Sequence, residues 1–150
     1  MFQWAMAYNF HPPLVSFPFA LISVVVILEL ILLFYRSEII AKAITVNLIF
    51  IVLTVVAAFF SGYQAMELAN VKSDFLQDLV AYHHNMGRLL LFSTLACFVM
   101  YLAAQKASKR KILFSLTYKL LLLLCFTLVI FTGYLGADLV FSHGIGVAQN

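Results

Sequence analysis

Long, nearly uninterrupted apolar stretches are the feature that most limits how this chain can fold. Four of them occur, at about residues 14–34, 39–60, 83–104 and 112–141. A run of about 18 or more apolar residues is long enough to cross the hydrocarbon core of a bilayer as a helix. Of the 150 residues only 10% are charged, whereas soluble domains carry about a quarter. We therefore expect one all-α domain over residues 1–150, a bundle of four transmembrane helices.

The connections between these stretches predict how the helices neighbour one another. The first and last connections, "RSE" and "QKASKRK", are short, which favours antiparallel neighbours in an up-down bundle. The middle connection is longer, and at about residues 70–80 its apolar residues fall on one helical face. That pattern predicts a short amphipathic helix on the membrane surface. The chain shows no clear internal repeat.

Basic residues predict the orientation of the bundle. They gather in the two short connections, and the last connection holds the densest group: Lys106, Lys109, Arg110 and Lys111. Because loops rich in Lys and Arg stay on the cytoplasmic side, both termini and the long connection should face outward. The net charge of +3 then follows from topology and does not indicate nucleic-acid binding. The first stretch is too long for a signal peptide and carries Glu29.

Histidines collect on the outward side of this topology. The chain has four, and each is expected near the same membrane face: His11, His83, His84 and His143. Gly133 and Gly136 precede His143 on the last helix, and small residues beside a potential ligand leave room for a large, flat group. Haem takes imidazole as an axial ligand, and helical bundles build such sites in their cores.

The sequence therefore predicts a b-type haem used for transmembrane or periplasmic electron transfer. Its iron would be held by His11 or His143 from one side and by His83 or His84 from the other. The chain has no CxxCH motif for covalent attachment. The side chain of Arg88 is a candidate partner for the haem propionates.

Two other interpretations use the same residues. The four histidines, with Asp138 or Glu67, could bind Zn²⁺ or Cu²⁺ in a metal-handling membrane protein. Alternatively, the histidines lie at a membrane interface in a non-catalytic assembly or scaffold subunit. We find no nucleophile and base set that indicates an enzyme, so an electron carrier or a subunit is the favoured class.

Polar residues within the apolar stretches need partners. An ionised Glu29 inside the membrane costs about 2.5–3.5 kcal/mol unless it is paired, so we expect an ion pair with Lys119 or Lys42. A proton path or quinone site is the alternative. In the second stretch, polar residues recur every seven positions and are expected to face the bundle interior: Asn47, Thr54 and Ser61.

The two ends of the chain, "HPPLVSFPFAL" and "TGYLGADLVFSHGIGV", resemble a bacterial family of four-helix membrane proteins of unknown function. The resemblance covers nearly the whole chain and rests on these positions: His11, Pro12, Phe17, Pro18, Gly62, His83 or His84, Gly136, Leu139, Val140, His143, Gly144, Gly146 and Val147. Relatives often carry a second histidine where this chain has Ser16. The resemblance implies a multi-pass protein of the bacterial inner membrane, in contact with lipid and with redox proteins such as cytochromes. It also implies that Gly144 and Gly146 turn the chain away after the last helix.

Overall fold

The structure, a computed structural model, describes residues 10–68, 71 and 73–145. Its elements are four α-helices: α1 (His11–Phe34), α2 (Glu38–Leu68), α3 (Asp74–Lys106) and α4 (Lys111–Phe141). Each is long and apolar enough to cross a membrane, which confirms the predicted all-α bundle of four membrane helices. α3 has 33 residues and is about 50 Å long. The hydrocarbon core is about 30 Å thick, so the ends of this helix extend beyond it.

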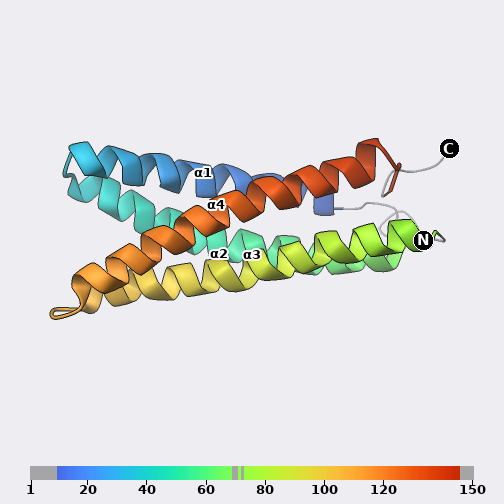
Figure 1. Cartoon of the computed structure of the whole chain (residues 1–150). Coiled ribbons are helices and arrows are strands. Elements are labelled where there is room, and N and C mark those ends of the chain that lie inside the picture. The colour runs from blue at the N-terminus through green and yellow to red at the C-terminus, as the bar shows by residue number, and fades with distance from the viewer. Residues whose placement is uncertain (1–9, 69–70, 72, 146–150) are drawn as a thin grey trace, which may run out of the picture.

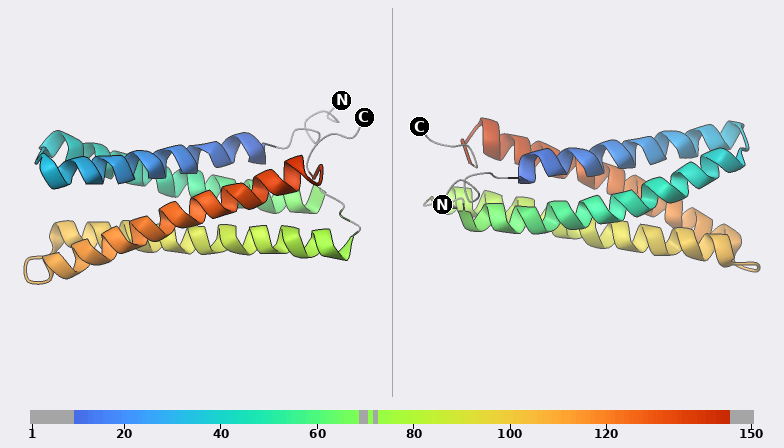
Figure 2. Two further views of the ribbon diagram at one scale, coloured as in Figure 1. Left: turned by 45° about the horizontal axis from the view of Figure 1, so that its top comes forward. Right: turned by 180° about the vertical axis from the view of Figure 1, so that it is seen from behind.

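The bundle consists of two helical hairpins, α1–α2 and α3–α4, as Figures 1 and 2 show. α1 contacts α2 and α4, and α3 also contacts α2 and α4, so α1 and α3 lie diagonally across the bundle. The tight turns of both hairpins lie at one end. The start of α1, the end of α4 and the connection between α2 and α3 lie at the other end (Figure 1). We call this second end the terminal end of the bundle.

Buried apolar side chains hold the four helices together. On each helix they recur every three or four residues, which places them on one face. On α2 this face consists of Ile44, Leu48, Ile51, Val55 and Ala58. On α3 it includes Leu90, Cys97 and Tyr101, together with the buried polar residue Thr94.

The helices begin and end at residues that the apolar pattern alone does not mark. α1 begins at His11 rather than at residue 14, because Pro12 and Pro13 occupy its first turn, where no backbone donor is required. α2 continues past residue 60 to Leu68. α3 begins at Asp74, so most of the expected amphipathic segment forms the first turns of α3. The apolar pattern marks only the part of each helix that crosses the lipid. Backbone hydrogen bonds continue the helix beyond that part.

α4 ends in the way that its glycine predicts. Gly144 has a left-handed φ of 65°, and its N–H donates to the carbonyl of Val140 at 3.0 Å. The N–H of Ile145 donates to the carbonyl of Leu139 at 2.9 Å. The bond from the N–H of Gly144 to the carbonyl four residues earlier is that of the αL C-capping motif, which glycine favours because it has no Cβ. Gly146 of the predicted turn and Val147 of the family resemblance lie outside the described part of the chain.

A polar group joins the hairpins near their turns. The Nζ of Lys119 lies 3.6 Å from Oε2 of Glu29, and the hydroxyl of Tyr118 donates to Oε1 of Glu29 at 2.9 Å. Of the two lysines expected to pair with Glu29, Lys119 is therefore the one in contact. These bonds satisfy a carboxylate whose side chain is only 15% exposed.

Candidate functional site

A cavity of about 480 Å³ opens between the four helices at their terminal end. Its walls are largely apolar, and its volume lies in the range typical of pockets that bind small molecules and cofactors. Small residues of α2, α3 and α4 leave the space open: Gly62, Ala65, Gly87, Gly133, Gly136 and Ala137. Both glycines that the sequence singled out, Gly133 and Gly136, line this cavity. So do three of the histidines: His11, His83 and His84.

His11 is held by α2. Its Nδ1 lies 3.0 Å from Oγ of Ser61, and that hydroxyl also lies 3.0 Å from the carbonyl of Ala58, to which it donates. A Ser61 hydroxyl that donates to Ala58 can only accept from the imidazole, a role that requires the His11 tautomer with the proton on Nδ1. A Cβ added at Gly62 would lie 2.8 Å from Cε1 of His11, so the ring fits here only because residue 62 is glycine.

His83 occupies the corresponding place in the second hairpin. Its ring lies against α4, where a Cβ added at Gly136 would be 3.1 Å from Cε1. The imidazole interacts with the backbone of Thr132. Its Nδ1 is buried, however, and makes no hydrogen bond of normal geometry within the described residues. Gly136 therefore accommodates His83, and not His143 as its sequence position suggested.

His11 and His83 face each other across the bundle. They belong to the diagonal helices α1 and α3, and their ring centroids are 6.2 Å apart with an angle of 81° between the ring planes. Two metal–nitrogen bonds of about 2 Å, together with two imidazole half-widths, add up to a similar separation. The separation of the two ring centroids is therefore close to that of two imidazoles bound to one metal atom.

His84 points to a different neighbour. Its ring lies 5.0 Å from that of Phe59 and 6.0 Å from that of Tyr63, both on α2. Successive residues of a helix point about 100° apart, so His83 and His84 cannot both face His11. The sequence left this choice open, and the structure places His83 opposite His11.

His143 and Arg88 lie apart from the histidine pair. The Nε2 of His143 is 3.8 Å from Oδ2 of Asp138, and its ring packs 6.1 Å from that of Phe75. Arg88 is exposed on α3. Within the described ranges, no three His, Cys, Asp or Glu side chains come together in a group that could hold a metal ion.

The structure also reveals a repeat that the sequence analysis missed. Residues 60–68, "FSGYQAMEL", and residues 131–139, "FTGYLGADL", share Phe, Gly, Tyr and Leu at the same positions. Ser aligns with Thr, Ala with Gly and Glu with Asp. Each segment lies near the end of the second helix of a hairpin and contacts the histidine that its first helix contributes. Aligning the two segments would have singled out Ser61 and Thr132.

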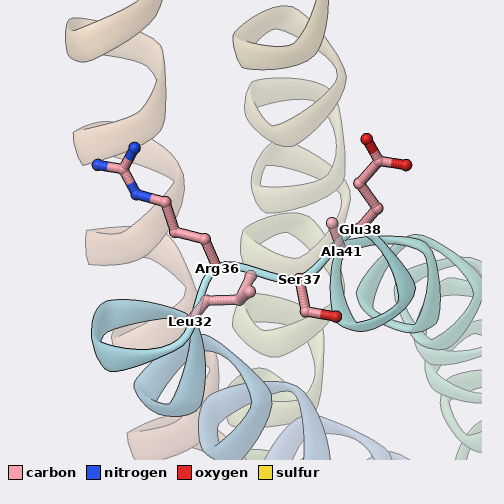
Figure 3. A pocket seen from close by; sticks show the side chains of 5 residues that line it. All are labelled: Leu32, Arg36, Ser37, Glu38 and Ala41. Atoms are coloured by element: carbon pink, nitrogen blue, oxygen red, sulfur yellow. The ribbon is translucent and has the colours of Figure 1, made fainter.

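A second hollow of about 390 Å³ lies at the turn between α1 and α2. Figure 3 shows its lining, in which the side chains of Arg36 and Glu38 point to opposite sides. Polar groups do not converge on a common point there, so the cavity with the histidine pair is the stronger candidate site.

Comparison with known proteins identifies a family. Neither the curated proteins nor the solved structures include a significant match to this chain. A family model described as "Predicted membrane protein" does match, and it spans residues 7–149, nearly the whole chain and the complete cavity. The match agrees with four membrane helices and with the resemblance seen in the two terminal motifs. The chain therefore belongs to the family of predicted membrane proteins DUF2231.

Proposed function

We propose that this protein binds one b-type haem between His11 and His83 and carries electrons at the terminal end of the bundle. The observation that supports this most strongly is the facing histidine pair, with ring centroids 6.2 Å apart, at an apolar cavity. Haem supplies one-electron chemistry when two protein ligands fill its axial positions. The chain's own contribution is to hold two imidazoles in place and to surround the site with apolar side chains.

The number of ligands and the size of the cavity favour haem over a bare ion. Zn²⁺ in proteins usually takes three or four protein ligands, whereas two imidazoles match the two axial positions of haem. A single ion would also leave most of the apolar cavity of about 480 Å³ unfilled. The small residues of three helices, which leave that space open, suit a flat macrocycle.

The position of the site suggests how electrons reach it. The cavity lies at the end of the bundle, where the helices extend beyond the hydrocarbon core, so a redox protein outside the membrane can approach it. Under the predicted topology this is the periplasmic side of a bacterial inner membrane, and a cytochrome is the kind of partner expected. Arg88 lies one helical turn from His84 on α3 and remains the proposed partner of the propionates.

A reduced-minus-oxidised visible spectrum of the detergent-purified protein, combined with a pyridine haemochrome assay, tests this proposal. We expect a sharp reduced α-band and about one haem per chain. His11→Ala and His83→Ala should each remove the low-spin spectrum. His84→Ala and His143→Ala are matched controls that should retain it, because their rings pack against Phe59 and Phe75 instead.

A colourless protein, purified after expression with ample haem, would overturn the proposal. Elemental analysis would then separate the two remaining hypotheses. Stoichiometric Zn or Cu that His11→Ala removes would indicate a metal-handling protein. Protein without metal would indicate an assembly or scaffold subunit.

A further inference from the structure

The two hydroxyl groups behind the facing histidines have no role in the proposal above. We propose that Ser61 and Thr132 are positioning residues, each of which accepts the Nδ1 proton of one histidine and so directs that histidine's Nε2 toward the bound metal. This inference rests on the proposed haem site and adds the groups that determine which nitrogen each ligand presents.

Ser61 already has this arrangement. Its hydroxyl hydrogen is directed to the carbonyl of Ala58 at 3.0 Å, which leaves its oxygen as an acceptor for Nδ1 of His11, also at 3.0 Å. A histidine that binds a metal nearly always donates its other ring N–H to such an acceptor, which fixes the tautomer and makes the ligand more basic. The α2 helix thus prepares His11 for coordination through Nε2.

Thr132 of α4 lies beside His83, and its hydroxyl behaves unusually. The hydroxyls of four other helical threonines each donate to the carbonyl four residues earlier: Thr45, Thr54, Thr117 and Thr127. The buried Oγ1 of Thr132 makes no hydrogen bond within the described residues. Nδ1 of His83, also buried, makes none there either. An unsatisfied buried polar atom costs about 1–3 kcal/mol, so two of them on neighbouring side chains require an explanation.

The position of the His83 ring supplies that explanation. The ring of His83 packs on Gly136 and interacts with the backbone of Thr132, so this ring lies beside the Thr132 side chain. A rotation of the Thr132 side chain would bring its hydroxyl into the role that Ser61 has in the first hairpin. We infer that His83 makes this bond when its Nε2 binds the metal.

The Ser61 part can be tested without haem by NMR of the protein carrying ¹⁵N-labelled histidine, with His11→Gln used to assign the signal. We expect His11 to be protonated at Nδ1. Ser61→Ala should shift it toward the Nε2-protonated tautomer, and Ser61→Thr should restore the original signal. Ser23→Ala, which removes an exposed serine hydroxyl bonded within α1, is the control. A His11 signal that Ser61→Ala leaves unchanged would overturn this part.

The Thr132 part is tested by haem titration and by the midpoint potential. Thr132→Val should weaken haem binding roughly 10- to 100-fold, as the loss of a hydrogen bond to a ligand typically does, and should raise the potential because a less basic imidazole stabilises ferric haem less. Thr132→Ser should restore both. Thr127→Val, which removes a hydroxyl bonded within α4, should change neither.

The outcomes separate this inference from the proposed function. If His11→Ala and His83→Ala lose haem while Thr132→Val retains the wild-type affinity and potential, the haem site stands and the role of Thr132 is wrong. If the wild-type protein binds no haem, the proposed function and the role of Thr132 both fail. In that case the NMR measurement of the His11 tautomer still tests whether Ser61 accepts the Nδ1 proton.

Discussion

Single residues determine how closely the helices approach at the histidine site. At Gly62 the ring of His11 occupies the space that a side chain would need, since an added Cβ would lie 2.8 Å from Cε1. At Gly87, on the opposite side of the cavity, an added Cβ would meet nothing within 4 Å. Two glycines that look alike in the sequence therefore have different physical roles.

Gly62→Ala and Gly87→Ala should accordingly have opposite effects on the stability of the haem-free protein. At Gly62 the methyl group forces His11 to move, and overpacking of this kind costs about 1–3 kcal/mol. At Gly87 alanine favours the helix by up to about 1 kcal/mol, so stability should be equal or higher. Denaturation in mixed detergent micelles measures both. Equal losses for the two variants would contradict the close approach at residue 62.

The sequence predicted which polar residues lie near the site better than it predicted which way they point. It placed the histidines together, but it left open whether His83 or His84 faces the centre. It also expected Asn47, Thr54 and Ser61 to face the interior: Ser61 contacts His11 of α1, whereas Asn47 and Thr54 are half-buried beside the apolar buried face of α2. Both side chains instead bond to carbonyls of their own helix, as short polar side chains in helices can. Such a bond satisfies the group without any partner helix, so polarity alone does not identify the interior face.

At the scale of elements, α1 and α4 are linked by an ion pair. Glu29 receives the hydroxyl of Tyr118 and pairs with Lys119. The two partners differ in burial: the side chain of Glu29 is 15% exposed and that of Lys119 is 43% exposed. Removing the lysine would leave a largely buried carboxylate without its cation.

Lys119→Met should therefore destabilise the bundle by about 1–2 kcal/mol. Loss of one partner from a fully buried pair costs about 3–5 kcal/mol, and the exposure of the lysine reduces that cost. The double variant Glu29→Gln/Lys119→Met should recover most of the loss, because no uncompensated charge remains. A double-mutant cycle under detergent denaturation measures the coupling. Strictly additive losses would show that the ion pair contributes nothing measurable.

Helix boundaries could be predicted only as far as the apolar pattern extends. The end of α4 was predictable because Gly144 is a local signal for a helix C-terminus. The start of α3 was not, since its first turns from Asp74 carry charged residues and a helix of this kind continues beyond the lipid. The repeat in α2 and α4 was overlooked for a related reason: the matching segments are short, and the apolar stretches before them differ in sequence.

The whole molecule is two hairpins that bring their histidines together at one end. This arrangement explains why the sequence could predict a common side for the histidines, since that follows from helix order alone. It could not predict that His143 lies outside the pair, because this depends on how α4 crosses toward α1 (Figure 2). The side of the membrane on which the site lies still rests on the distribution of basic residues.

Labelling of single cysteines tests that orientation. Ser73 and Ser108 are exposed at opposite ends of the bundle, one before α3 and the other after it, while the native Cys97 and Cys125 are each 2% exposed. In spheroplasts, a membrane-impermeant maleimide should label Ser73→Cys at once and Ser108→Cys only after lysis, because the loop with Lys109, Arg110 and Lys111 stays in the cytoplasm. The reverse pattern would place the histidine pair on the cytoplasmic side, and the redox partner would then have to be sought there.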